Sequence, residues 1–244
     1  MNRHLEKVFE TKEFINENGE IIPIHSETSK DQCAFLQQII KENKFSKSIE
    51  IGFAYGLSTL AITEEVTNNN GSHLVIDKFQ NSSWGGNGLS LIEKAGLRDR
   101  LEFYESYCYE ALPKLLAEGR KFDFAYVDTT KQFDWILVDF FYLDKLLELN
   151  GVIVFDDAFY PGIRKALRYI SQFPSYKIYS HYPQNRESSF TKKIASYLRH
   201  IPKANHLIKD NLIQLDEELS INASCVAIQK IDNDIRNWDW HVDF

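Results

Sequence analysis

Aspartates that directly follow short apolar runs are the residues of this sequence with the most specific chemistry. Asp128 ends the run Phe-Ala-Tyr-Val-Asp, and Asp156 and Asp157 end Gly-Val-Ile-Val-Phe-Asp-Asp. Three carboxylates at two neighbouring strand ends repel one another unless a cation or a basic residue lies between them. Oxygen ligands with a high negative charge suit a hard divalent cation such as Mg²⁺ or Ca²⁺. The pattern favours a cation site, and a solvated turn or cap residue is the alternative for each aspartate.

A glycine turn follows an earlier apolar run, in the stretch Glu-Ile-Gly-Phe-Ala-Tyr-Gly-Leu-Ser from residue 50 to residue 58. Gly52 and Gly56 permit a sharp bend and the close approach of a ligand, and we expect Ser58 to cap the next helix. Asp77 ends a second apolar run about 20 residues further on, where a carboxylate can bind ribose hydroxyls. The three-glycine dinucleotide fingerprint is absent, so a plain strand-to-helix turn is the alternative.

Alternating strand and helix patterns position these residues. Continuous apolar runs predict strands that are buried on both faces, and the run from residue 133 to residue 149 predicts a helix that stops at Asn150-Gly151. The predicted strands cover residues 48–52, 73–77, 101–104, 124–128, 151–156, 176–180 and 224–228. Further helices are predicted over residues 58–66 and from Pro161-Gly162 to about Phe173. Strands that alternate with helices indicate a mostly parallel sheet with helices on both faces.

A single domain accounts for the whole pattern, because the chain has no repeat and no long low-complexity linker. We divide it into a helical lead-in (1–45), a cofactor-binding core (46–180), a variable helical excursion (181–222) and a final strand with the tail (223–244). In the core, ligands are expected outside the carboxyl ends of the strands.

Composition excludes several classes of protein. The chain has 244 residues, a formal net charge of -7 and 3 cysteines that are far apart in sequence. The acidic balance argues against nucleic-acid and membrane partners, and no apolar run approaches the roughly 18 residues of a membrane span. The cysteines match no metal motif or disulfide framework, so we expect a cytoplasmic protein.

These residues resemble class I S-adenosylmethionine-dependent methyltransferases, in particular the branch of the catechol and caffeoyl-CoA O-methyltransferases and the bacterial macrocin-type enzymes. The glycine turn is similar to the first motif of that fold, and Asp128-Thr129-Thr130-Lys131 is similar to its aspartate-x-x-lysine stretch. Asp156-Asp157 is similar to its aspartate-asparagine pair. The resemblance covers about residues 26–180 and implies a Rossmann-like, mostly parallel seven-stranded sheet with an antiparallel late strand.

The resemblance also implies roles for individual residues. Lys131 would be the base beside the acceptor hydroxyl, and Asp128, Asp156 and Asp157 would bind magnesium or another divalent cation. Cofactor contacts are expected from Glu50, Gly52, Tyr55, Gly56, Ser58, Asp77, Ser106, Tyr107 and Asp128. Two departures from the family pattern are Thr129, where glycine or alanine is usual, and Asp157, where asparagine is usual.

The sequence therefore predicts a methyltransferase that uses S-adenosylmethionine to methylate a hydroxyl of a small molecule or natural product, aided by a divalent cation. A metal-independent methyltransferase of the same fold is an alternative. So are a non-catalytic module that only binds S-adenosylmethionine and a nucleotide-cofactor oxidoreductase. The expected partner is a small-molecule acceptor, and the chain could form a homo-oligomer.

Overall fold

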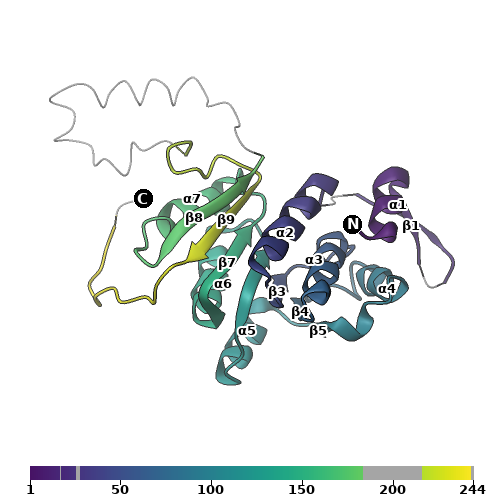
Figure 1. Ribbon diagram of the computed structural model, residues 1–244, viewed down its shortest axis with the longest axis horizontal. Helices are drawn as coiled ribbons and strands as arrows, with labels where there is room; N and C mark the ends of the chain where they lie inside the picture. Colours follow the sequence, from purple (N-terminus) through teal and green to yellow (C-terminus); the bar gives the residue numbers. More distant parts are fainter. Residues whose placement is uncertain (17, 26–27, 184–215, 243–244) are drawn as a thin grey trace.

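A seven-stranded sheet forms the centre of the molecule (Figure 1). The structure is a computed structural model, and it describes residues 1–16, 18–25, 28–183 and 216–242. The strands are β3 (Lys47–Ile51), β4 (Ser72–Ile76), β5 (Leu101–Tyr104), β6 (Phe122–Val127), β7 (Leu147–Phe155), β8 (Tyr176–Tyr182) and β9 (Cys225–Lys230). Their order is β5-β4-β3-β6-β7-β9-β8, the first five are parallel, and β9 runs antiparallel to both of its neighbours. The predicted fold class is confirmed.

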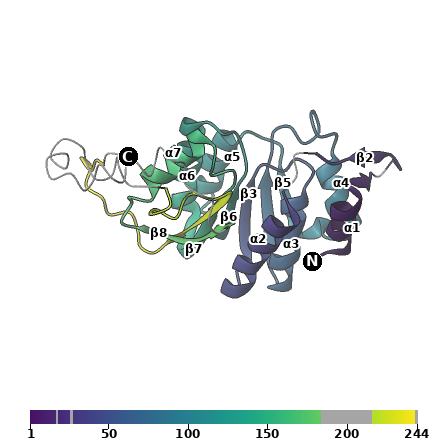
Figure 2. The ribbon, with the colours of Figure 1, turned by 90° about the horizontal axis from the view of Figure 1, so that it is seen from above.

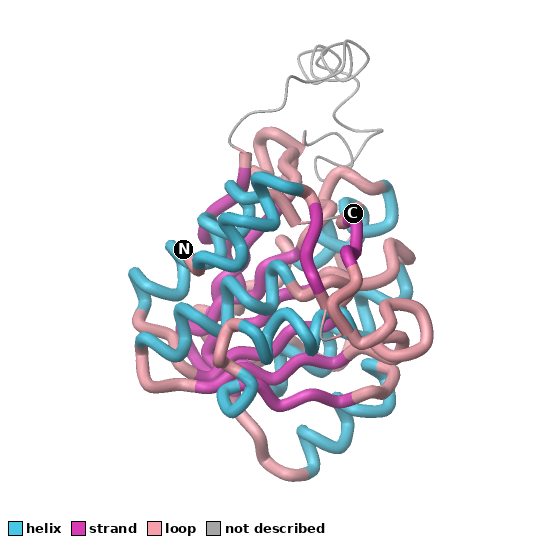
Figure 3. Tube along the Cα trace, turned by 90° about the vertical axis from the view of Figure 1, so that its right-hand side faces the viewer, coloured by secondary structure: helices cyan, strands magenta, loops and turns pink. Residues whose placement is uncertain are grey.

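Helices cover both faces of this sheet (Figure 2), which lies as a central layer between them (Figure 3). The pair α2 and α3 packs on one face, and α5, α6 and α7 pack on the other. The helices are α1 (Arg3–Thr11), α2 (Lys30–Asn43), α3 (Leu57–Asn68), α4 (Asn87–Lys94), α5 (Cys108–Ala117), α6 (Phe133–Leu146) and α7 (Pro161–Ile170), with a 3-10 turn at Arg98–Arg100. No helix among the described residues is long and apolar enough to cross a membrane.

Strand β6 shows why continuous apolar runs form the centre of the sheet. Phe124 and Tyr126 pack in the cluster formed with α2 and α3, whereas Ala125 and Val127 pack in the cluster formed with α5, α6 and α7. Each of the four is at most 2% exposed. Since successive side chains of a strand point to opposite faces, a strand between two helical layers favours apolar residues on both faces.

The predicted stop of the long helix at Asn150-Gly151 is wrong. Helix α6 ends at Leu146, and Leu147 already pairs with Phe122 of β6. Asn150 does take the left-handed conformation, with φ 68°, but it lies within β7, where the pairing register with β6 shifts. Leu147 is buried against the sheet, so strand pairing ends the helix before the left-handed residue is reached.

The lead-in contains a hairpin as well as helices. Strands β1 (Glu13–Ile15) and β2 (Ile21–Pro23) pair between α1 and α2. Strands of three residues give no periodic signal, so sequence alone predicts only helix here.

At the other end of the chain, most of the predicted 181–222 excursion lies outside the described residues.

Candidate active site

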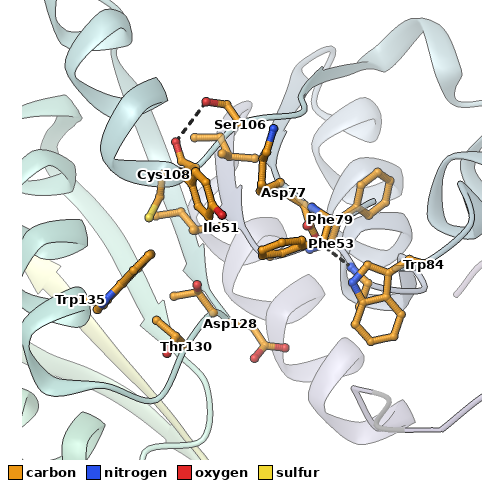
Figure 4. Close-up of a pocket in the computed structure, with 16 residues that line it drawn as sticks. Ile51, Phe53, Asp77, Phe79, Trp84, Ser106, Cys108, Asp128, Thr130 and Trp135 are labelled. Atoms are coloured by element: carbon orange, nitrogen blue, oxygen red, sulfur yellow. Dashed lines mark hydrogen bonds between the residues drawn. The ribbon is translucent and has the colours of Figure 1, made fainter. Parts of the chain in front are cut away.

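A cavity of about 460 Å³ opens at the carboxyl ends of β3, β4, β5 and β6 (Figure 4). This is the edge at which open parallel sheets bind ligands. Five of the predicted cofactor residues line it, namely Gly52, Asp77, Ser106, Tyr107 and Asp128. Trp84 and Trp135 lie on opposite sides of the group of side chains in this view.

Asp77 holds the glycine turn in place. Its Oδ2 accepts hydrogen bonds from the backbone N–H of Phe53 (2.9 Å) and of Ala54 (3.1 Å). Its Oδ1 accepts one from the backbone N–H of Phe79 (2.7 Å). The carboxylate therefore ties the turn after β3 to the end of β4 and remains half-buried in the cavity wall. A second tie comes from the buried Gln80, whose Nε2 donates to the carbonyl of Ala54 (2.9 Å).

Gly52 is required because two strand ends approach each other closely at this position. Its φ is +102°, and a Cβ built on it would lie 2.0 Å from the carbonyl oxygen of Asp128. Only glycine combines this backbone conformation with this contact. The approach places the turn after β3 directly beside Asp128, so both form one wall of the cavity.

Tyr55, Gly56 and Ser58 line a smaller recess of about 30 Å³ that also includes Gly52 and Asp128. The predicted cap role of Ser58 is wrong, because α3 begins at Leu57 and its N-cap is Gly56, with φ 80°. The Ser58 hydroxyl instead donates to Oε1 of Glu50 (2.6 Å).

Glu50 is the one predicted cofactor residue that lines neither cavity among those the structure describes. It is 0% exposed, and its Oε2 lies 2.9 Å from Nε2 of His73. Nδ1 of His73 in turn lies 2.8 Å from the Ser48 hydroxyl. A buried carboxylate needs such partners, so Glu50 stabilises the base of the glycine turn from within the sheet.

Aromatic side chains that the sequence analysis leaves out complete the cavity. Tyr107 contacts Phe79 edge-on (ring centroids 5.8 Å apart) and lies 6.5 Å from Trp135. Phe53 and Phe79 follow strand ends by two and three residues, whereas Trp135 lies in the first turn of α6, eight residues after β6. The signal that finds the two phenylalanines is therefore position after a strand rather than residue type, and this signal does not reach Trp135. Flat apolar walls of this kind suit a planar heteroaromatic ring.

Lys131 lies between two of the predicted metal ligands. Its Nζ is 2.7 Å from Oδ1 of Asp128 and 2.8 Å from Oδ2 of Asp157. Burial opposes the charge of the ammonium group, but the two carboxylates outweigh burial and raise the pKa of Lys131 above its ordinary value. In this arrangement Lys131 is a charged donor, and it would act as a base only after separation from both carboxylates.

Asp156 is 6% exposed, and both of its carboxylate oxygens accept hydrogen bonds from groups inside the protein. Its Oδ2 accepts from the hydroxyl of Tyr126 (2.8 Å), and its Oδ1 accepts from Nε2 of Gln32 (3.0 Å) and from the thiol of Cys225 (3.1 Å). Burial, and next the charge of Asp128, raise the pKa of Asp156 to about 6, against the effect of its hydrogen bonds. No group of three metal-ligating side chains forms among the described residues. As arranged, these residues do not fit a three-carboxylate cation site.

The chain matches a known family over this region. Residues 49–158 match the family described as a methyltransferase domain. Caffeoyl-CoA O-methyltransferase 1 of Eucalyptus globulus is 31% identical over 158 residues, which are 60% of this chain and 62% of that protein. Caffeoyl-CoA O-methyltransferase 1 of Zea mays is 34% identical over 159 residues, 60% of this chain and 59% of that protein. The matched region thus spans about three fifths of these curated relatives.

Solved structures share the fold. An O-methyltransferase from Bacillus cereus, solved in complex with SAH, superposes with a TM-score of 0.59 at 23% identity, over 73% of this chain and 83% of that chain. An SAH-bound methyltransferase from Podospora anserina superposes with a TM-score of 0.57 at 17% identity, over 73% and 83%. The chain therefore has the fold of these solved methyltransferases, and residues 49–158 are similar in sequence to a methyltransferase domain.

Proposed function

We propose that this protein transfers a methyl group from S-adenosylmethionine to a hydroxyl oxygen of a small molecule. The observation that carries the proposal is the cavity at the carboxyl edge of the sheet, which is lined by Asp77 and, beside the glycine turn, by Asp128. The curated relatives are named as O-methyltransferases, and the two solved structures contain SAH. These likenesses support the same reaction here.

The donor would occupy the cavity along its length. Asp77 would accept hydrogen bonds from ribose hydroxyls, since a carboxylate can accept more than the three backbone bonds that Asp77 already receives. Tyr107, Phe79 and Trp135 would surround the adenine ring. Asp128 and Asp157 together outweigh the single positive charge of Lys131, so this end of the cavity keeps a net negative charge, which favours the positively charged sulfonium group.

Methyl transfer from a sulfonium is a direct displacement, so the protein must hold the acceptor oxygen in line with the methyl carbon. Lys131 is the residue that we propose for contact with that oxygen, because its ammonium group lies at the Asp128 side of the cavity. The arrangement of Asp128, Asp156 and Asp157 does not fit the magnesium ion that the resemblance implies, and we assign no step to it. Cytoplasmic location also stays a prediction; the three cysteines are free and buried, as in a reducing compartment.

Ligand binding tests the donor. S-Adenosylhomocysteine at about 100 times its Kd is expected to raise the Tm by roughly 5–10 °C, because a ligand that binds only the folded state adds about 2.7 kcal/mol at that excess. NAD at the same concentration is expected to leave the Tm unchanged. Differential scanning fluorimetry with both ligands measures this.

The opposite pattern, a shift with NAD alone, would support the oxidoreductase alternative. Binding of S-adenosylhomocysteine without methylation of any member of a panel of phenolic and sugar hydroxyls would support the non-catalytic alternative. Catechol and caffeoyl-CoA belong in that panel because of the names of the relatives.

A further inference from the structure

The ammonium group of Lys131 occupies the space between two carboxylates that a bound cation would share. Asp128 and Asp157 each approach Nζ within 2.8 Å. The side chain of Lys131 is 30% exposed, that of Asp128 32% and that of Asp157 28%. The three therefore form the floor of a site that is open to solvent, and they are not an ion pair buried in the core. The positive charge of Lys131 thus lies between Asp128 and Asp157, the two predicted metal ligands that are exposed to solvent.

Packing on both sides holds this arrangement. At one end, the carbonyl of Asp128 lies against Gly52, where a Cβ would approach it to 2.0 Å. At the other end, the carbonyl of Lys131 lies against Gly162, where a Cβ would approach it to 2.3 Å. Backbone contacts this close fix the backbone at both ends of the segment, and the two ion pairs hold the ammonium group of Lys131 in place.

The third predicted ligand is committed elsewhere. Asp156 is 6% exposed and accepts hydrogen bonds from groups on β6, α2 and β9, and also from the backbone N–H of Asp157 (2.8 Å). To reach a cation beside Asp128 it would have to leave these donors, and the hydroxyl of the fully buried Tyr126 would lose the partner that the structure gives it. A divalent ion would therefore have to displace Lys131 and find only two side-chain ligands.

We propose that Lys131 is the resident cation of the acceptor site, in place of a divalent metal ion, and that methyl transfer by this protein is metal-independent. An ammonium group has three N–H donors, and among the described residues two of them point to Asp128 and Asp157. The third donates to the acceptor oxygen and orients it. This inference rests on the proposed function for the identity of its acceptor.

The chemical step balances without a metal. The acceptor O–H gives its proton to the carboxylate of Asp157, and the oxygen forms a bond to the methyl carbon. The carbon–sulfur bond breaks, its electron pair stays on sulfur, and the sulfonium becomes a neutral thioether. Lys131 keeps its proton throughout and stabilises the negative charge that develops on the oxygen before the new bond is complete.

Metal binding by variants of the full chain tests the inference without any assay of activity. We expect wild type to bind Mn²⁺ weakly, as measured by the electron paramagnetic resonance signal of free Mn²⁺. Lys131→Gln removes the cation and leaves two carboxylates facing each other, so we expect it to bind one Mn²⁺ at least tenfold more tightly. Lys131→Arg keeps a cation and is expected to behave like wild type, and adding Asp157→Asn to Lys131→Gln should abolish the gain.

Tight binding of one Mn²⁺ by wild type, equal to that of Lys131→Gln, would overturn the inference. So would weak binding by both proteins, because the carboxylates would then form no cation site that Lys131 could fill. Lys131→Met serves as the second variant if Lys131→Gln does not fold. Titration of wild type and each variant with S-adenosylhomocysteine separates the two proposals. If wild type does not bind S-adenosylhomocysteine, the proposed function is refuted. The Mn²⁺ comparison tests only the role of Lys131.

Discussion

Replacing Asp77 with asparagine is expected to weaken the binding of S-adenosylhomocysteine about 100-fold. The carboxylate holds the turn after β3 through two backbone N–H groups and would also accept hydrogen bonds from the ribose. An asparagine keeps the shape but has one acceptor oxygen and no charge. The loss of charge-assisted bonds of this kind is worth about 3 kcal/mol, which corresponds to about 100-fold in affinity. Isothermal titration calorimetry measures the change.

Asp123 provides a matched control at the opposite edge of the sheet. Its carboxylate accepts from the backbone N–H of Ser46 (2.8 Å) and of Lys47 (3.0 Å), at the start of β3, just as Asp77 holds the residues after the end of β3. Asp123→Asn is therefore expected to lower the Tm and to leave the affinity for S-adenosylhomocysteine within twofold of wild type. Equal losses of affinity in the two variants would mean that Asp77 acts only through the stability of the turn, and an unchanged affinity in Asp77→Asn would refute the ribose contact.

The architecture follows from local signals because most positions of the buried strands are apolar. Strand β5 has its predicted bounds, residues 101–104, and the other six strands of the central sheet lie within a few residues of theirs. The end of α6 could not be predicted this way, since it depends on the pairing of Leu147 with Phe122, which are distant in sequence.

The site shows the same division. Residues that follow strand ends, such as Asp77 and Asp128, could be placed at the cavity from sequence because parallel strands bring their carboxyl ends to one edge. The direction of each side chain could not. Asp156 turns inward because Gln32 and Cys225, 124 and 69 residues away, donate hydrogen bonds to it, and Glu50 turns inward because His73 lies beside it on the next strand.

A buried aspartate behind the cavity carries the largest expected effect on stability. Asp139 lies on α6, is 0% exposed, and neither of its carboxylate oxygens has a hydrogen-bond partner in the part of the chain that the structure describes. Burial raises the pKa of Asp139 from 3.8 to about 7, and the nearby thiol of Cys108 only partly offsets this. Thiols are weak donors, so the carboxyl group is more stable here in its neutral, protonated form.

The free energy of unfolding depends on pH because the folded and unfolded states bind different numbers of protons at Asp139. Between about pH 4 and pH 7 the folded protein keeps a proton on Asp139 that the unfolded chain has lost, so the free energy of unfolding falls as the pH rises. Above pH 7 the folded state buries a full negative charge. The contribution of Asp139 is thus greatest in acid and lost through neutral pH, and the difference between 3.8 and 7 corresponds to about 4 kcal/mol at most.

Asp139→Asn is accordingly expected to raise the Tm at pH 8 by roughly 5–10 °C and to change it little at pH 4 to 5. Asparagine resembles the protonated acid in shape and carries no charge. Cys108→Ser should give part of the same gain, because the Cys108 side chain lies near a carboxylate that has no hydrogen-bond partner among the described residues, and a hydroxyl is a better donor than a thiol. Thermal denaturation from pH 4 to pH 9 measures both variants, with Asp134→Asn on the exposed side of α6 as the control that should follow wild type.

Parallel profiles of Tm against pH for wild type and Asp139→Asn would show that Asp139 does not hold a proton near neutral pH. If Asp139→Asn lowers the Tm at every pH, the carboxylate of Asp139 has a stabilising interaction that the loss of its charge removes.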